Sequence, residues 1–522
     1  MILRAACQKP LYRLALAFLS ASLAPVFFTA AQGLYDEPWR PQFHFTPATN
    51  FMNDPNGLVY YKGEYHLFYQ HNPQGAEWGH MSWGHAVSDD MLHWRHLPLA
   101  IPEEPDRYMI YSGSAVVDWH NSSSLCASTD SSDPSCIVAI YTAAAKDSQT
   151  QHLAFSNDRG RTWSNFSANP IADLNQPDFR DPKVFWYEPQ KKWVMVAVFA
   201  DEKEVKILDS TDLKKWKLRS TFGPLGAAKG QWECPDLFEL PLDDNSRAKK
   251  WAMIVNRNPG APAGGTGTEY FVGRFDGEKF TNETSTDQEL WADYGKDFYA
   301  TNSFSDLPAS DGRRIWIGWT SNWQYANTEP TKLWRGAQSL PRVLRLKTYA
   351  DGIRLIQTPI KEVEQLRTKL LLRGNAFSIQ QANDKIRAAN INGDTLEIEA
   401  DIIPRESGDT GFRVRKGQSE ETLVGISAKT REIFIDRTRS GLVSFSPDFS
   451  GRHHASLRWT SPVKLHIFLD RSSVEVFAND GETVLTDRIY PSPGSTGFEV
   501  YSDAPDARIS SLSIWKLGSI WK

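Results

Sequence analysis

The sequence has few cysteines, and this excludes a fold held together mainly by disulfides. Only 4 occur among 522 residues, whereas small stapled domains carry several in a short chain. Cys126 and Cys136 flank a polar stretch, and we expect a local disulfide between them in an oxidising compartment. Cys234 is then left unpaired, and we expect it to be a small buried packing residue.

A surplus of positive charge is also absent. The formal net charge is −5, and residues 1–31 contribute three positive charges and no negative ones, so the rest of the chain carries −8. A polyanionic partner requires a basic surface. We therefore expect no nucleic-acid partner.

Long hydrophobic runs are nearly absent, with one exception near the start. Arg4, Lys9 and Arg13 precede an apolar stretch over residues 14–28, which small residues follow up to Ala31. This pattern predicts a signal peptide over residues 1–31 and a secreted, extracellular protein. A membrane anchor is the alternative, but the run is short and no basic stop-transfer cluster follows it. Three Asn-x-Ser/Thr triplets are potential glycosylation sites in a eukaryotic host: Asn121, Asn165 and Asn282.

Helical periodicity is scarce as well, and short apolar runs separated by Gly, Pro, Asn and Asp predict an all-β chain. A degenerate motif recurs at residues 88–94, 156–163 and 210–216, each time after a hydrophobic run and each time ending in Trp. We interpret it as a polar hairpin turn repeated in the blades of a β-propeller, although three weak copies also fit ordinary hairpins. The expected fold is a five-bladed β-propeller over residues 32–356.

The pattern changes at residues 357–370, the best helical stretch in the sequence, which we expect to be a short linker. A second β region follows, and residues 371–522 predict a C-terminal β-sandwich. Within it, residues 473–477 read SVEVF, and we expect a core strand with Val474 and Val476 buried.

A metal site is not expected, although one region is rich in histidine. The pairs 66/71 and 80/85 differ by an odd number, so their members would lie on opposite faces of a strand, and no HExxH-like set exists. We predict no metal and no cofactor, and we interpret these side chains as structural: His66, His71, His80, His85, His93 and His96.

Three acidic residues have local settings that suit chemistry. Retaining glycoside cleavage needs two carboxyl groups, one ionised to attack and one protonated to donate to the leaving oxygen. Asp54 precedes Pro55 in NFMNDPNG, where Gly57 is expected to allow a tight turn into the next strand. An ordinary surface turn is the alternative.

Asp181 follows Arg180 in DFRDPKVFW, and Glu233 follows Trp232 in GQWECPDLFEL. The alternatives are a surface ion pair and a plain strand-end Glu. Because residues 54, 181 and 233 are far apart in the chain, we expect each to come from a different blade and to meet the others at the propeller axis.

Together these motifs resemble those of glycoside hydrolase family 32, the β-fructofuranosidases that include invertases, exo-inulinases and levanases. The resemblance rests on MNDPNG at 52–57, YSGSA at 111–115, FRDP at 179–182, WECPD at 232–236 and SVEVF at 473–477. It implies a five-bladed propeller with a C-terminal β-sandwich. By motif match it implies Asp54 as nucleophile, Asp181 as transition-state stabiliser and Glu233 as acid/base.

The same resemblance implies the residues that bind the terminal fructose: Asn53, Gln70, Trp78, Ser112 and Arg180. Trp334 is expected to add an aromatic wall, with Trp319 or Trp323 as alternatives. Two positions depart from the family pattern, since Phe51 stands where Trp is usual and Tyr111 where Phe is frequent.

The sequence as a whole resembles microbial levanases and exo-inulinases in particular, which implies an exo-acting, retaining enzyme on fructan or sucrose. We expect a monomer or homodimer with no membrane partner. A fructosyltransferase with the same site is one alternative, and a fructan-binding lectin without turnover is another.

Overall fold

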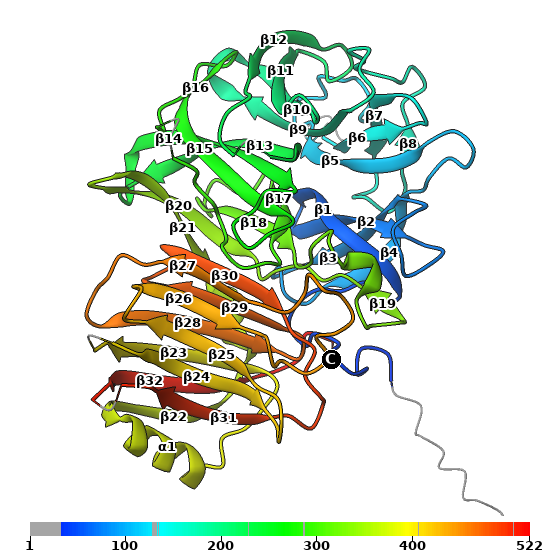
Figure 1. Ribbon diagram of the computed structural model, residues 1–522. Helices are drawn as coiled ribbons and strands as arrows, with labels where there is room; N and C mark the ends of the chain where they lie inside the picture. Colours follow the sequence, from blue (N-terminus) through cyan, green and yellow to red (C-terminus); the bar gives the residue numbers. More distant parts are fainter. Residues whose placement is uncertain are drawn as a thin grey trace, which may run out of the picture.

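The computed structural model describes residues 33–521 except 128–132, 134, 228, 286–287, 406 and 505. The predicted signal peptide, residues 1–31, lies outside the described residues. The chain forms two β-rich bodies, one built from the blue-to-green part of the sequence and one from the yellow-to-red part (Figure 1).

The first body consists of five sheets of antiparallel strands, each connected in chain order. The first blade contains β1 (Asn50–Tyr61), β2 (Glu64–Asn72), β3 (Ser82–Ser88) and β4 (Arg95–Ile101), with β19 (Trp334–Arg335) beside β1. The second contains β5 (Met109–Val117), β6 (Ile137–Ala144), β7 (Gln149–Ser156) and β8 (Ser164–Asn165). The third contains β9 (Phe179–Tyr187), β10 (Lys192–Phe199), β11 (Glu204–Ser210) and β12 (Lys217–Phe222), with η1 (Glu188–Gln190) after β9.

The last two blades are joined by a short parallel contact between β13 and β20. The fourth contains β13 (Gln231–Leu242), β14 (Asn245–Asn258), β15 (Gly267–Phe275) and β16 (Phe280–Asn282). The fifth contains β17 (Tyr299–Ser303), β18 (Arg314–Trp319), β20 (Arg342–Tyr349) and β21 (Gly352–Pro359), with η2 (Ala326–Thr328) after β18.

The first strands of the blades form a ring. β1 contacts β5, β5 contacts β9, β9 contacts β13, β13 contacts β17, and β17 contacts β1 again. The five-bladed propeller predicted from the sequence is therefore confirmed, and its innermost strands surround one axis.

The recurring sequence motif occupies equivalent places in the first three blades, between the third and fourth strands. In each copy an Asp carboxylate accepts backbone N–H groups of the turn, and the Trp that follows is buried or half-buried. The fourth blade has the same turn in FDGEKF, where Asp276 accepts the N–H groups of Glu278 and Lys279, and Phe280 takes the place of Trp. The sequence comparison missed this copy because only the acid is retained.

The predicted linker contains the end of β21, a 3-10 helix η3 (Lys361–Leu366) and the start of the next strand. The second body is a sandwich of two sheets, as predicted. One sheet contains β22 (Arg367–Ser378), β23 (Leu396–Ile403), β28 (Val463–Asp470), β29 (Ser473–Ala478), β30 (Thr483–Arg488) and β32 (Arg508–Leu517). The other contains β24 (Asp409–Lys416), β25 (Thr422–Ser427), β26 (Glu432–Asp436), β27 (Arg452–Ser456) and β31 (Gly497–Ser502).

One α-helix, α1 (Ile379–Ala388), packs on the sandwich at the end far from the propeller (Figure 1). It begins with a capping box between Ser378 and Gln381, which satisfies N–H groups that have no partner inside a helix. Ala382 and Ile386 face the sandwich core. The sequence pattern did not indicate this helix, because its apolar stripe is only these few side chains wide.

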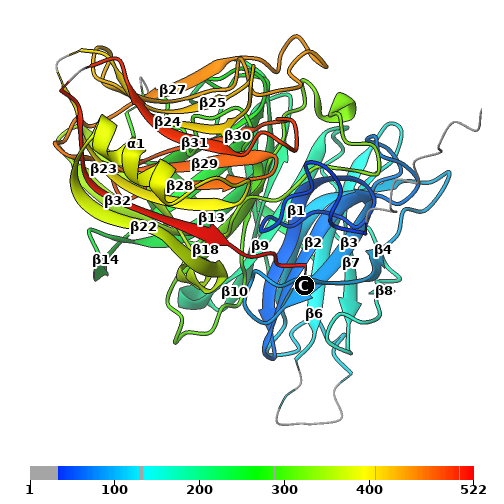
Figure 2. The same cartoon turned by 90° about the horizontal axis from the view of Figure 1, so that it is seen from below.

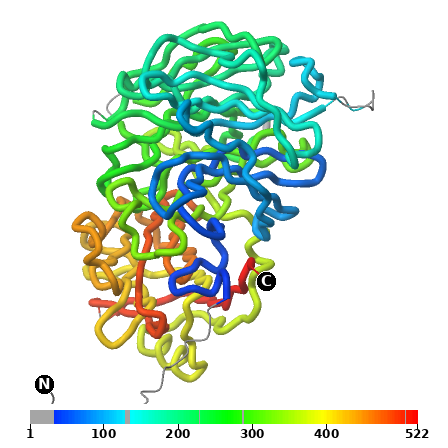
Figure 3. Tube along the Cα trace, turned by 90° about the vertical axis from the view of Figure 1, so that its right-hand side faces the viewer, coloured from blue at the N-terminus to red at the C-terminus, as the bar shows by residue number. Residues whose placement is uncertain are grey.

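The sandwich packs against the propeller through a shared core. Phe468, Phe477 and Val484 cluster there with Ile315 and Leu340 of the propeller. The end of the chain reaches the first blade, beside β1 and β2 (Figure 2). The first described residues and the last ones lie side by side at this junction (Figure 3), where the rings of Tyr35 and Trp521 stack at 4.1 Å.

Strand β29 carries a charge across this junction. Val474 and Val476 are buried as expected, but Glu475 between them faces the propeller. Its carboxylate pairs with Arg342 at 2.7 Å and contacts a ring nitrogen of His44 at 2.9 Å. Burial alone would raise the pKa of Glu475, yet Arg342 and His44 lower it to about 2. The junction is therefore ionic as well as apolar.

Candidate active site

A cavity of about 380 Å³ opens at the axis of the propeller. Burial increases from its mouth, where Trp78 is 40% exposed, to Asp54 and Asp181, which are 9% and 6% exposed. The residues that line it come from all blades: Asn53, Asp54, Gln70, Trp78, Tyr111, Ser112, Gln149, Arg180, Asp181, Gln231, Glu233, Asn258, Trp323 and Asn327.

Each inner strand breaks its pairing register at the level of this cavity. The interruptions lie at Met52/Pro55 in β1, Ile110/Gly113 in β5, opposite Val196/Val198 in β9, at Glu233/Asp236 in β13 and at Tyr299/Asn302 in β17. A bulge re-aims the side chain that it carries. The expected tight turn at Asp54 is therefore not present, because residues 50–61 form one strand whose bulge directs the acid inward.

The backbone is unusual at three of these bulges. Asp181 has φ +61°, Cys234 has φ +42° and Ala300 has φ +51°. Left-handed backbone costs a residue with a side chain roughly 1–2 kcal/mol. Such strain is concentrated at functional sites, where the surrounding structure enforces it.

Asp54 is held by three donors at the bottom of the cavity. Its carboxylate accepts hydrogen bonds from the Ser112 hydroxyl at 2.6 Å and the Asn53 amide at 2.9 Å, and the Cys234 thiol lies 3.4 Å away. Burial raises the pKa of Asp54 to about 6, while the Ser112 hydrogen bond acts in the opposite direction. Near neutral pH the carboxylate is ionised and fixed in orientation, as a nucleophile requires.

Asp181 lies next to it, and Cys234 contacts both acids. The Cys234 N–H donates to Asp181 Oδ2 at 2.9 Å, and its thiol lies 3.7 Å from the same oxygen. Burial raises the pKa of Asp181 to about 7, against the attraction of Arg180. Cys234 is free and buried, as predicted, but it contacts the acids of the site and not only apolar neighbours.

Glu233 has polar partners on both oxygens. Arg180 Nη2 donates to Oε1 at 2.9 Å, and the buried Tyr299 hydroxyl donates to Oε2. Trp232, which precedes it in the sequence, does not form an apolar wall beside it and is fully buried in the core between the third and fourth blades. The side chains of adjacent strand residues point to opposite faces, so Trp232 faces away from the cavity.

All the fructose-binding positions implied by the family motifs line the cavity, whereas Trp334 does not. Trp334 is 1% exposed, and its ring lies against Arg40 at 4.4 Å and Arg488 at 5.7 Å. Trp323, one of the alternatives, lines the cavity instead. The expectation for Trp334 is corrected, because β19 turns its ring into the interior.

Several lining residues were not identified from the sequence. Three lie at strand ends and one in η2, outside the family motifs and without a local signal: Gln149, Gln231, Asn258 and Asn327. The oxygens of Gln149 and Asn53 are buried without a hydrogen-bond partner in the described structure. Unpaired polar atoms in a cavity are suited to a ligand rich in hydroxyl groups.

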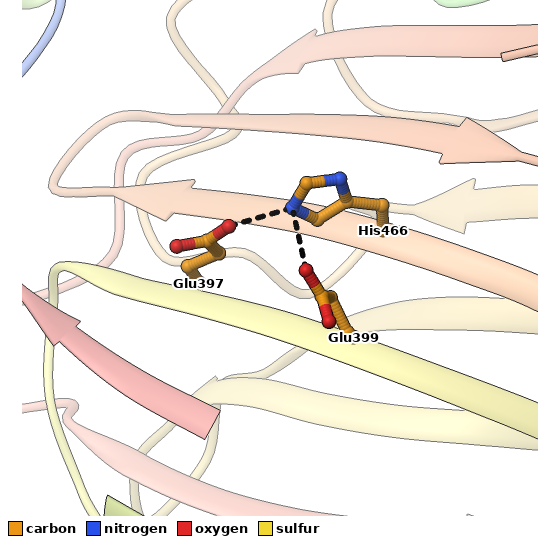
Figure 4. A group of neighbouring side chains, drawn as sticks. All are labelled: Glu397, Glu399 and His466. Atoms are coloured by element: carbon orange, nitrogen blue, oxygen red, sulfur yellow. Dashed lines mark hydrogen bonds and ion pairs between the residues drawn. The ribbon is translucent and has the colours of Figure 1, made fainter. Parts of the chain in front are cut away.

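The described residues contain one group of side chains close enough to hold a metal ion, and it lies in the sandwich. It consists of Glu397, Glu399 and His466, which converge on one nitrogen (Figure 4). Arg367 forms a two-pronged pair with Glu397 at 2.7 Å and contacts Glu399 at 3.1 Å. Both carboxylates thus already have a cationic partner in Arg367, so we interpret the group as an ion-pair network.

Comparison with known proteins gives a consistent result over the described chain. The model of the glycosyl hydrolases family 32 N-terminal domain matches residues 44–359, and the family 32 C-terminal model matches residues 362–516. A levanase of Bacillus subtilis is 49% identical over 499 residues, covering 94% of this chain and 72% of that protein. An extracellular exo-inulinase of Aspergillus awamori is 38% identical over 524 residues, covering 93% and 96%.

Solved structures agree with this result. The crystal structure of the exo-inulinase from Aspergillus awamori aligns with a TM-score of 0.84 at 36% identity, covering 93% of this chain and 100% of that one. A β-fructofuranosidase from Schwanniomyces occidentalis, complexed with fructosyl-erythritol, aligns with a TM-score of 0.83 at 31% identity, covering 94% and 100%.

Proposed function

The chain belongs to glycosyl hydrolases family 32, and from this we propose that it is an exo-acting β-fructofuranosidase that releases terminal fructose from fructans and sucrose. The observation that carries the proposal is the meeting of three acids, from three different blades, in one cavity. The names of the relatives, levanase and exo-inulinase, favour hydrolysis over fructosyl transfer.

The proposed reaction is a double displacement with retention. Asp54 attacks the anomeric carbon of the terminal fructosyl unit, while the Glu233 carboxylic acid gives its proton to the departing oxygen. A fructosyl ester of Asp54 forms and the remaining sugar leaves as an alcohol. Glu233, now a carboxylate, removes a proton from water, whose oxygen attacks the same carbon and frees Asp54.

Asp181 and Arg180 have supporting roles in this proposal. Burial and the nearby charge of Glu233 raise the pKa of both Asp54 and Asp181. The cluster of three carboxyl groups therefore retains a proton close to neutral pH. Arg180 offsets one negative charge through its contact with Glu233. We assign the Asp181 carboxyl to hydrogen-bonding sugar hydroxyls and to stabilising the positive charge that develops on the ring.

Purified protein incubated separately with levan, inulin and sucrose tests the proposal. We expect free fructose as the early product from each substrate, in the β-anomeric form when observed by NMR before mutarotation. Oligofructosides as the dominant product at high sucrose would identify a transferase. Binding without any product would identify a lectin.

We further propose that residues 1–31 direct export and are removed after Ala31, leaving residues 32–356 as the catalytic domain and residues 371–522 as the sandwich. Some relatives are named extracellular. The described part of the chain holds no helix of the length and apolar character that a membrane crossing requires. N-terminal sequencing of protein recovered from culture medium tests this proposal, with residue 32 as the expected first residue.

A further inference from the structure

The segment that follows β18 forms part of the cavity wall and also contacts the sandwich. Trp323 and Asn327 line the cavity, whereas Tyr325 between them is 2% exposed and belongs to a buried cluster with Phe449 and Tyr490 of the sandwich. Alternate residues of one short segment thus face the cavity and the sandwich.

The Tyr325 hydroxyl is held by two charged groups. It donates to Asp297, in the propeller, and accepts from Arg437 Nη2, in the sandwich, at 3.0 Å. Arg437 also pairs with Asp297 at 2.6 Å. All three side chains are buried, at 2%, 0% and 0% exposed, so each is fixed by the other two.

Arg437 is in turn immobilised by its own domain. Its Nε donates to the carbonyl of Phe449 at 2.7 Å, its Nη1 donates to the carbonyl of Arg488 at 2.9 Å, and its guanidinium lies 3.8 Å from the centre of the Phe449 ring. The planar fork of an arginine suits such simultaneous contacts, which a lysine cannot reproduce.

The same segment also supports the mouth of the cavity. Asn327 Oδ1 accepts a hydrogen bond from the backbone N–H of Trp78 at 2.8 Å. Arg335 donates to the carbonyl of Ala76 at 2.8 Å and to that of Asn327 at 2.5 Å. The exposed ring of Trp78, in the loop between β2 and β3, is therefore positioned through the segment that Tyr325 anchors.

We propose that Arg437 of the sandwich is a positioning residue for the outer wall of the active site, acting through Tyr325 on Trp323, Asn327 and Trp78. Arg437 itself contacts none of the three acids of the cavity and does not line the cavity. The inference rests on the proposed function, since the wall is taken to contact substrate. Loosening the wall is expected to weaken substrate binding and leave the chemistry of the buried acids intact.

Tyr325→Phe and Arg437→Lys test the proposal by steady-state kinetics on sucrose and inulin. Tyr325→Phe removes the hydroxyl alone and keeps the ring packing. We expect KM to rise about 3- to 10-fold, the change that corresponds to one buried hydrogen bond, with kcat within about 2-fold of the parent.

Matched substitutions elsewhere in the sandwich separate positioning from general loss of stability. Tyr501→Phe removes a buried hydroxyl that has no partner in the described structure. Arg415→Lys replaces a buried arginine whose hydrogen bonds all go to sandwich carbonyls, those of Ser495, Arg471 and Ser492. Both controls are expected to leave KM unchanged, even where Arg415→Lys lowers Tm.

A double variant identifies the route. If Tyr325 acts through the wall, adding Tyr325→Phe to Trp323→Ala raises KM less than it does in the parent, because one of the three wall residues is already removed. Independent, fully multiplicative effects, or an unchanged KM in both Tyr325→Phe and Arg437→Lys, overturn the inference. A parent enzyme that hydrolyses no fructoside would instead contradict the proposed function, so the two failures are distinguishable.

Discussion

The Ser112 hydroxyl donates a 2.6 Å hydrogen bond to Oδ2 of Asp54, joining the inner strands of the first two blades. The bond favours the ionised form of an acid whose pKa burial raises to about 6. It therefore influences the pH at which the proposed nucleophile becomes active.

Replacing Ser112 by Ala should move the acidic limb of kcat/KM to higher pH. Without the donor, the pKa of Asp54 rises further, and a protonated carboxyl cannot attack. The loss of one hydrogen bond to a charged group corresponds to about 1 to 2 pH units. Ser210→Ala, at the end of β11 in the third blade, is the control, because this buried hydroxyl also donates to a single Asp carboxylate, that of Asp212. An unchanged acidic limb would show that Ser112 does not tune Asp54.

Asp54→Asn and Glu233→Gln should each reduce kcat by several orders of magnitude, because nucleophilic and acid/base catalysis each contribute strongly. Both changes keep the size and part of the hydrogen bonding of the side chain. Asp147→Asn, on the surface, should leave kcat unchanged. Unaltered rates in either active-site variant would refute the assigned role.

The same Asp54→Asn change should stabilise the protein at neutral pH. The folded pKa of Asp54, about 6, lies above the reference value of 3.8, so the native state retains its proton when the unfolded chain has lost it. Asp54 therefore lowers the free energy of unfolding. This destabilisation is absent below pH 4, grows as pH rises, and is complete above about pH 6.

We expect Asp54→Asn to gain on the order of 1–3 kcal/mol at pH 7.5, visible as a rise in Tm of a few degrees, and little at pH 4. Asp181→Asn should behave similarly, with its window extending to about pH 7. Thermal unfolding at the two pH values measures this difference, with Asp147→Asn as control. A lower Tm for both variants at pH 7.5 would contradict the expectation.

Glu475→Ala should destabilise the whole molecule. Removing it leaves Arg342 and His44 buried with a lost partner, and breaking a buried pair in this way costs about 3–5 kcal/mol. Glu399→Ala removes an acid of the same sandwich that is 47% exposed, and its cost should not exceed about 1 kcal/mol. Denaturant unfolding compares the two variants. Equal losses of unfolding free energy would show that the buried ion pairs of the junction do not stabilise the protein more than a surface pair does.

The sequence predicted the propeller, the sandwich and the three acids because these leave local signals. An acid followed by proline and an apolar run can be recognised within the sequence of a single strand. The turns centred on Asp recur at equivalent places in the blades. The bulges were not predictable, since a bulge depends on the strand opposite. Tyr299, Tyr325 and Arg437 were missed for a related reason: each acts through a partner distant in sequence. Trp334 was misplaced because its motif does not show which face of β19 turns inward.

The ring of bulged inner strands couples the blades to one another. Each bulge lies within the pairing of one blade, but the side chains that it aims contact those of other blades: Ser112 of the second blade and Cys234 of the fourth both contact Asp54 of the first. A substitution that shifts one inner strand therefore also moves a group that orients a carboxyl of another blade. We expect substitutions at the bulges to be tolerated less well than substitutions in the outer loops of the blades.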